Sequence, residues 1–161
     1  MDRGRNKRRD RLVQEKSHDV YRRREKWPEP TQCSSCKAVF VGGRWTWSSS
    51  DQAVNNAVCP ACQRIADRYP AGVVEIRGEF SKEHRTEILN LIHNLENAEK
   101  AEHPLERIMA ISDEVDATVI TTTGIHLARH IGKALARAYE GDLTMQYGDG
   151  EQSVHLSWER D

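Results

Sequence analysis

Four cysteines occur as two pairs, and each pair has the spacing of a metal-binding turn. Two residues separate Cys33 from Cys36 and Cys59 from Cys62, and 22 residues lie between the pairs. This spacing lets both thiolates of a tight turn point at one ion, and two such turns complete a tetrahedron. Four protein ligands leave no open coordination position, so we expect one structural Zn²⁺ with no catalytic role.

Two other uses of paired cysteines fit the sequence less well. A thioredoxin-like redox site needs a single pair that opens a helix after a strand. Iron–sulfur clusters also use four cysteines, but their usual spacings are more compact or differ in kind. The chain has no stretch of 18 apolar residues and no apolar run behind its basic N-terminus. We therefore expect no membrane association, a cytoplasmic location and reduced cysteines.

The segment before the cysteines forms a basic arm, rich in arginine. Residues 1–26 carry 11 Lys and Arg against 5 Asp and Glu, a net charge of +6, whereas residues 73–161 carry 9 against 17, a net charge of −8. Arginine favours bidentate phosphate contacts. We expect an arm over residues 1–30 that is disordered when free and orders on a polyanion; a solvated tail is the alternative. Its candidate RNA contacts are Arg8, Arg9, Arg11, Arg22, Arg23, Arg24 and Lys26.

Further basic residues are candidates for the same surface. Arg44 precedes Trp45 and Trp47, which form either a small core, the favoured interpretation, or a platform for stacking on bases. Trp27 packs against the cysteine module or stacks on bases. On the helix expected over residues 124–140, basic residues share one face, although any amphipathic helix needs a polar face. The additional candidates are Arg44, Arg64, Arg68, His126, Arg129, His130, Lys133 and Arg137.

Residues 31–70 should position the four thiolates as a zinc ribbon. Aromatic and β-branched residues flank Gly42-Gly43, which predicts a two-residue hairpin. A polar loop follows over residues 48–56. The sequence CPACQRIADRY ends in a short helix that has Ile65 and Tyr69 on one side.

Residues 71–161 alternate between strand and helix patterns. Strands are expected over 72–78, 106–112, 117–123, 142–147 and 153–158, and helices over 81–100 and 124–140. Ser81 and Thr123 are the expected N-caps, and Gly141 suits a left-handed C-terminal cap. The second helix should bury one apolar face, formed by Leu127, Ile131, Leu135 and Ala138.

The order β-α-β-β-α-β-β predicts an α+β chain. The economical packing is a ferredoxin-like domain with one extra strand, in which two helices cover one face of a mostly antiparallel sheet. Catalysis is not expected. His126 and His130 are four residues apart, but no Glu occupies the metalloprotease position and no third ligand is evident. We expect a monomer without a small-molecule substrate.

Five segments resemble a family of small bacterial zinc-ribbon proteins over nearly the whole chain: PEPTQCSSC, CPACQRIADRYPAG, EILNLIHN, AEHPLERIMAI and TTTGIHLARHIGKAL. More distantly, the cysteine module is similar to the N-terminal part of the large-ribosomal-subunit nuclear export adaptor of eukaryotes and archaea. That family implies binding to the large subunit through zinc modules, without catalysis. The adaptor typically carries more cysteines there and has further domains. The resemblance therefore implies the four zinc ligands and, more weakly, a ribosomal location, but not nuclear export.

Together these features predict a zinc-ribbon protein that binds ribosomal RNA, on the large ribosomal subunit, as an assembly, quality-control or dormancy factor. A protein–protein adaptor without direct RNA contact is the alternative, in which the arm adds only solubility. A third hypothesis is an enzyme that uses His126 or His130.

Overall fold

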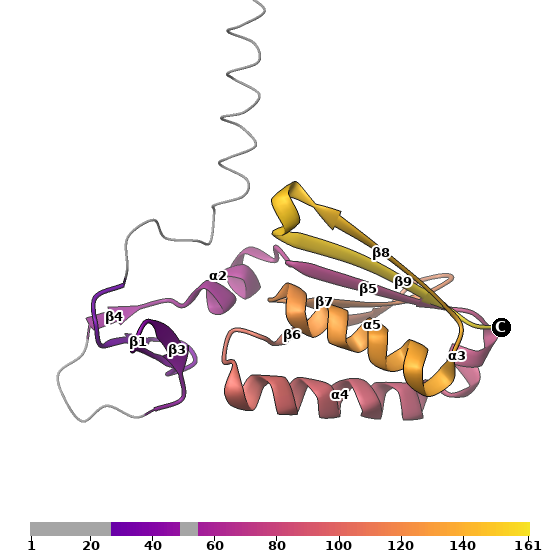
Figure 1. Cartoon of the computed structure of the whole chain (residues 1–161), viewed down its shortest axis with the longest axis horizontal. Helices are drawn as coiled ribbons and strands as arrows, with labels where there is room; N and C mark the ends of the chain where they lie inside the picture. The colour runs from indigo at the N-terminus through magenta and orange to yellow at the C-terminus, as the bar shows by residue number, and fades with distance from the viewer. Residues whose placement is uncertain (1–26, 49–54) are drawn as a thin grey trace, which may run out of the picture.

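The computed structural model describes residues 27–48 and 55–161. It is an α+β protein, as predicted, with two separate sheets and two clusters of buried residues. The smaller sheet lies at one end of an elongated molecule and the larger one fills the rest (Figure 1). The candidate contacts of the arm lie outside the described residues: Arg8, Arg9, Arg11, Arg22, Arg23, Arg24 and Lys26.

The smaller sheet and the helix after it form what we call the cysteine unit, residues 27–48 and 55–69. Its strands follow the order β3-β2-β1-β4. Gly42 and Gly43 connect β2 to β3 with φ angles of 64° and 80°, which confirms the predicted two-residue hairpin. The elements are β1 (Thr31–Cys33), β2 (Val39–Val41), β3 (Arg44–Thr46), β4 (Asn55–Ala57) and α2 (Pro60–Asp67).

β4 was predicted as loop, and it matters for the cysteines. Its polar residues gave no strand pattern, yet β4 pairs in parallel with β1, so that Cys33 lies opposite Ala57. This pairing brings the second cysteine pair beside the first, because Cys59 follows two residues after Ala57. The pairing of β1 with β4, which are distant in sequence, therefore brings the two cysteine pairs together, whereas the local spacing only positions the two cysteines within each pair.

Trp45 of β3 and Trp47, which follows that strand, have different environments. Trp45 is 8% exposed and packs edge-on against Trp27 and Phe40, with ring centroids 5.4 and 5.6 Å apart. The core interpretation is confirmed for Trp45, and packing is confirmed for Trp27. The core interpretation is wrong for Trp47, which is 39% exposed. Its indole Nε1 donates to the carbonyl of Lys100 at 2.6 Å. Trp47 thus connects the cysteine unit to the rest of the chain.

The larger sheet contains all five predicted strands, in the order β6-β7-β5-β9-β8. Three of its four strand pairs are antiparallel, and β5 pairs in parallel with β9. The final hairpin therefore places its second strand between β5 and its own first strand. The strands are β5 (Gly72–Arg77), β6 (Ile108–Asp113), β7 (Thr118–Thr122), β8 (Asp142–Gly148) and β9 (Ser153–Glu159), with a 3₁₀ turn η1 (Asp149–Glu151) between the last two.

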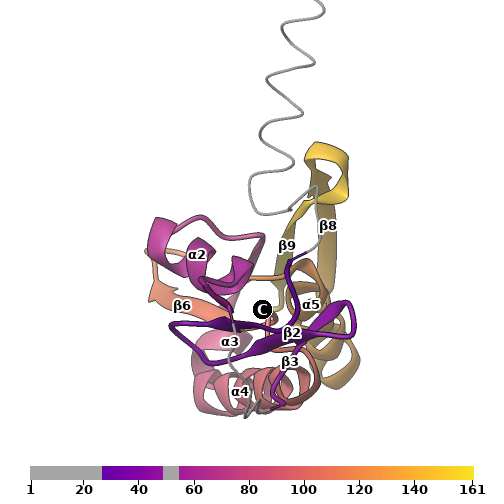
Figure 2. The ribbon, with the colours of Figure 1, turned by 90° about the vertical axis from the view of Figure 1, so that its left-hand side faces the viewer.

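Two helices, α4 (Arg85–Glu102) and α5 (Ile125–Tyr139), lie on the same side of this sheet (Figures 1 and 2). The side chains of β5 alternate, so that Val74 and Ile76 are buried under the helices while Glu75 lies on the other face. The core also contains Ile88, Ile92, Ile120, Leu127, Ala128, Ile131, Leu135, Val154, Leu156 and Trp158. No helix in the described residues is long and apolar enough to cross a membrane.

The helix predicted over 81–100 is in fact two helices. A short helix, α3 (Glu79–Glu83), precedes α4, and the break falls at His84, whose φ and ψ are −111° and 25°. The ring of His84 stacks on that of Phe80 at 4.1 Å. The predicted cap at Ser81 is wrong, since this residue lies inside α3 and its hydroxyl donates to the carbonyl of Gly78 at 2.7 Å.

The predicted cap of α5 at Thr123 is also wrong. Its hydroxyl donates to the carbonyl of Leu105, and no side chain of the preceding residue caps the helix. Instead, the Glu106 carboxylate accepts from the backbone N–H of Leu127 at 2.8 Å, which satisfies one of the free amides of the first turn. Gly141 has a φ of 82°, as predicted. The predicted burial of Ala138 is wrong, since this residue is exposed and the next one, Tyr139, packs against the core in its place.

Candidate metal centre

The four cysteine sulfur atoms lie within 4.8 Å of one another. The Sγ atoms of Cys36 and Cys59 are 3.8 Å apart. A tetrahedron with thiolate bonds of about 2.3 Å has edges of about 3.8 Å, so a single ion fits the four donors. This is the one group of His, Cys, Asp or Glu side chains in the described part of the chain that is close enough to hold a metal ion.

Backbone N–H groups around the cysteines donate hydrogen bonds to the sulfurs, which orients them and favours their thiolate form. Cys33 ends β1, and its Sγ accepts from the backbone N–H of Cys36 at 3.4 Å and of Cys59 at 3.3 Å. Cys59 is the N-cap of α2, where its Sγ accepts from the N–H of Cys62 at 3.4 Å. Pro60 takes the first position of the helix, which needs no N–H donor. The Cys59 thiol thus takes the role of an ordinary helix-capping group.

Burial and these hydrogen bonds shift the pKa values of the thiols in opposite directions. Burial alone would raise the pKa of Cys33, but the backbone N–H groups that point at its sulfur together lower the pKa to about 6. Burial raises the pKa of Cys36 and of Cys59 above the usual thiol value. Without a cation, the buried site favours protonated Cys36 and Cys59 at neutral pH. A metal ion supplies the positive charge that keeps all four sulfurs deprotonated.

Arg107 places a positive charge beside the cysteine sulfurs, and the sequence patterns did not indicate it. Its Nη2 lies 3.3 Å from the Sγ of Cys59, 3.4 Å from that of Cys62 and 3.8 Å from that of Cys36. The residue is 9% exposed. Burial by itself would lower the pKa of the guanidinium, but the thiolates raise it above its usual value. Because four thiolates around a divalent ion carry a net charge of −2, one guanidinium offsets half of that charge.

Arg107 comes from the larger part of the chain, in the loop between α4 and β6. Its backbone N–H donates to the hydroxyl of Thr123 at 2.8 Å, and its carbonyl accepts from the N–H of Thr123, also at 2.8 Å. The residue directly after β7 therefore holds the arginine in place. No sequence pattern could have indicated this role, because 44 residues lie between Arg107 and the nearest cysteine, Cys62.

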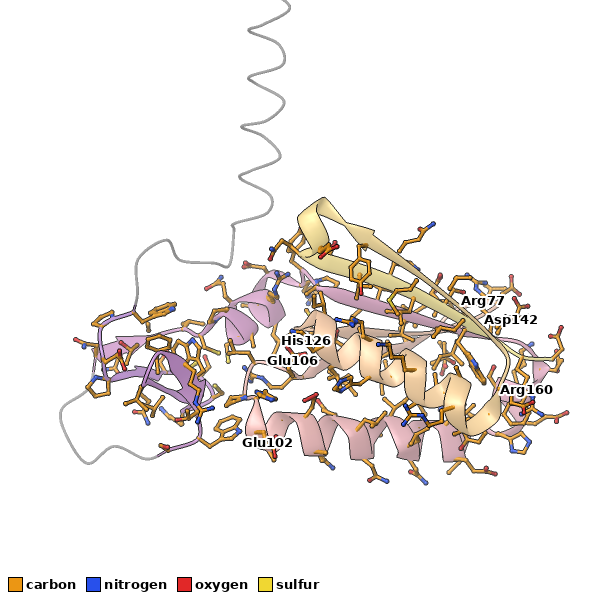
Figure 3. The ribbon with its side chains drawn as sticks, in the orientation of Figure 1. Arg77, Glu102, Glu106, His126, Asp142 and Arg160 are labelled. Carbon is orange, nitrogen blue, oxygen red and sulfur yellow. The ribbon has the colours of Figure 1, made fainter. Side chains whose placement is uncertain are left out.

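A cavity of about 530 Å³ lies beside the metal centre, where the cysteine unit meets the rest of the chain. Figure 3 shows Glu106 and His126 together at this junction. The cavity is bounded by β3, by the end of α4 with the loop after it, and by the first half of α5. Its lining residues are Arg44, Trp45, Glu99, His103, Pro104, Leu105, Glu106, His126 and His130.

The candidate RNA contacts of the described residues lie on β3, on α2 and its C-cap, and on α5. Arg44, His126 and His130 line the cavity. Arg64 and Arg68 belong to α2 and its end; Arg64 Nη1 donates to the carbonyl of Tyr69 at 3.1 Å, and Arg68 is the left-handed C-cap.

The basic face of α5 is partly neutralised by its neighbours. His130 Nδ1 lies 2.8 Å from Glu99 of α4. Arg129 is half-buried, and its Nε atom has no hydrogen-bond partner in residues 27–48 and 55–161. Lys133 and Arg137 are exposed beyond the cavity. One member of the face predicted as uniformly basic, His130, therefore lies against an acidic residue of α4.

Comparison with protein-family models and with curated proteins gives no match for this chain. The resemblance to the zinc-ribbon family and to the export adaptor accordingly stays a prediction.

Proposed function

We propose that the protein is a non-catalytic, zinc-binding protein that binds ribosomal RNA on the large ribosomal subunit, as an assembly, quality-control or dormancy factor. In this proposal the chain is a cytoplasmic monomer, the cysteine unit is a zinc ribbon, and the metal only holds the fold. The observation that carries it is the packing of Trp27 on Trp45. Residue 27 follows the arginine-rich arm directly, so the arm joins the fold beside Arg44 and the cavity.

Zinc is the metal that suits this donor set best. Four thiolates in a tetrahedron are typical of Zn²⁺ or of iron–sulfur sites, and the spacing of the pairs favours zinc. Three sulfurs face Arg107 and the fourth, Cys33, faces backbone amides. A site enclosed in this way has no position for a substrate, which supports a structural role.

The strand arrangement supports a ferredoxin-like domain in part. β5 and β6 are connected through α4 and have β7 between them, antiparallel to both, which is the split β-α-β pattern. The parallel pair of β5 and β9 departs from the sheet expected with one extra edge strand. The proposed domain is therefore a variant in which the extra strand is inserted.

The charge distribution supports a polyanion as the partner. The arm carries a net charge of +6, and arginine outnumbers lysine in it by eight to three. Bidentate guanidinium contacts suit phosphates, and this type of binding weakens steeply as salt rises. The acidic remainder would face solvent or basic ribosomal proteins. RNA is favoured over a protein partner because a segment this rich in arginine suits the repeated phosphates of a nucleic acid.

One observation favours the adaptor alternative. Ile65 and Tyr69, predicted to lie on one side of the helix after the second cysteine pair, are 41% and 47% exposed. Exposed apolar side chains of this kind can mark a protein interface. An adaptor would keep its partner after nuclease treatment, whereas an RNA-binding protein would lose its ribosomal association.

We expect the arm to carry most of the salt-dependent affinity for RNA. Reversing Arg22, Arg23 and Arg24 to Glu removes about three phosphate contacts. The slope of log K against log salt should then be shallower by about 2, because each contact to single-stranded RNA contributes about 0.7. Filter binding of purified ribosomal RNA at several salt concentrations measures this slope.

The matched control changes the same three arginines to lysine, which keeps the charge. It should retain the slope and lose affinity only modestly, since lysine binds phosphate as a point charge. Equal slopes for the glutamate variant and the unchanged protein would contradict RNA binding through the arm.

A further inference from the structure

The cavity at the junction has the size and position of a ligand site. Its volume of about 530 Å³ falls within the roughly 300–1,000 Å³ that small-ligand pockets span, and such pockets occur preferentially between structural units. It is built from three segments far apart in sequence, the first of which is β3 of the cysteine unit. Its shape therefore depends on how the cysteine unit is held against the helices.

The charges inside the cavity are already partly compensated. Glu99 is 14% exposed and pairs with His130 at 2.8 Å. One oxygen of Glu106 accepts from the N–H of Leu127. Both carboxylates thus already have a hydrogen-bond partner within the fold. Both keep acceptor capacity, because a carboxylate offers about four lone-pair positions.

The opening of the cavity carries groups that suit an anion. Arg44, His103 and His126 are exposed residues among those that line the cavity. A guanidinium binds phosphate strongly, and imidazole rings can donate to phosphate oxygens. The lining of the cavity is mostly apolar, with two hydrogen-bonded carboxylates, and exposed basic side chains lie at its rim. This arrangement fits a neutral, largely apolar group that carries a phosphate outside.

Flat rings make up much of the wall. Trp45 lines the cavity on the side of the cysteine unit, and the imidazole rings of His103, His126 and His130 line it on the side of the helices. Aromatic and histidine rings are the platforms on which proteins stack unpaired bases. Carboxylates accept hydrogen bonds from exocyclic amino groups such as that of cytosine. Rings, carboxylates and a basic rim together match a nucleotide.

We propose that this cavity binds one unpaired nucleobase of an RNA strand, with the phosphate of that nucleotide against Arg44. This inference rests on the proposed RNA-binding function and names the ligand of its surface. Glu99 and Glu106 accept from the amino group of the base, so cytosine, adenine and guanine bind better than uracil, which has no exocyclic amino group. The arm holds the strand, and the cavity selects the base.

Titration of the zinc-loaded full chain with the four nucleoside 5′-monophosphates tests this inference, with tryptophan fluorescence and calorimetry as readouts. CMP, AMP and GMP should bind saturably, and UMP should bind about tenfold more weakly or worse, as expected for a lost hydrogen-bonded edge. His126→Ala should weaken binding by about tenfold, since base stacking is worth about 1–3 kcal/mol. The matched control is His93→Ala, an exposed histidine of α4 outside the cavity, which should leave binding unchanged.

The outcomes separate this inference from the proposed function. Loss of nucleotide binding in His126→Ala but not in His93→Ala supports it. If ribosomal RNA binds with the expected salt dependence while no mononucleotide binds, or UMP binds as tightly as CMP, the base site is overturned and the RNA function stands. If mononucleotides bind but RNA does not, the proposed function and the base site for an RNA strand both fail.

Discussion

Replacing Cys59 with serine should abolish stoichiometric metal binding and unfold the cysteine unit, while the larger sheet stays folded. The cysteine unit buries few side chains: its core is Cys33, Ala38, Phe40, Trp45, Cys59 and Ala61. Two of these six are themselves proposed ligands, so little apolar area remains to stabilise the unit without the ion. Zinc in small peptides contributes about 10–16 kcal/mol, far more than such a core supplies.

The measurement is the metal-to-protein ratio together with an NMR amide spectrum. We expect a ratio near one for the unchanged protein and a collapse of the cysteine-unit signals in Cys59→Ser. Ser35→Ala is the matched control, because Ser35 is exposed and lies between the first two cysteines without being one of the proposed ligands. Retention of one tightly bound metal per chain in Cys59→Ser would show that the four cysteines do not form the site.

Replacing Arg107 with alanine should destabilise the protein by about 3 kcal/mol or more, because removing one partner of a buried charge pair leaves the other uncompensated. The substitution should destabilise both the cysteine unit and its packing against the rest of the chain, since Arg107 Nη2 contacts three sulfurs at 3.3–3.8 Å. Zinc affinity should fall about 10–100-fold, as for other groups that hydrogen-bond to metal ligands. Denaturant unfolding and competition with a chelator measure the two effects.

Arg85→Ala is the control for this prediction. Arg85 also pairs with an acidic group, Asp113 at 2.8 Å, but both side chains are largely exposed. Its removal should change stability little, because exposed ion pairs are screened by solvent. Arg107→Lys should fall between the two, because lysine keeps the charge but not the planar guanidinium that reaches several sulfurs. Unchanged stability and zinc affinity in Arg107→Ala would refute a role for the arginine at the metal centre.

Local patterns predicted the elements of the fold well. The hairpin at Gly42-Gly43 and the five strands of the larger sheet follow from short-range signals that act within a few residues. β4 and the parallel β5–β9 pair could not be predicted in this way. Both depend on pairing between strands distant in sequence, and β4 has no strand pattern of its own.

The same division holds for helix ends and for the candidate site. Ser81 and Thr123 have the right residue type for caps, but Glu106, from a distant loop, takes the place of Thr123 at α5. Spacing indicated the four cysteines, whereas Arg107 and the pairing of His130 with Glu99 are visible only in three dimensions. Groups that compensate charge across a fold leave no periodic trace in the sequence.

The central proposal is tested most directly by sedimentation of a cell lysate through a sucrose gradient at low and high salt, followed by detection of this protein. Binding to ribosomal RNA through the arm predicts co-migration with large ribosomal subunits at low salt and release at high salt. A protein that stays at the top of the gradient at low salt, in growing and in starved cells alike, would contradict the ribosomal function.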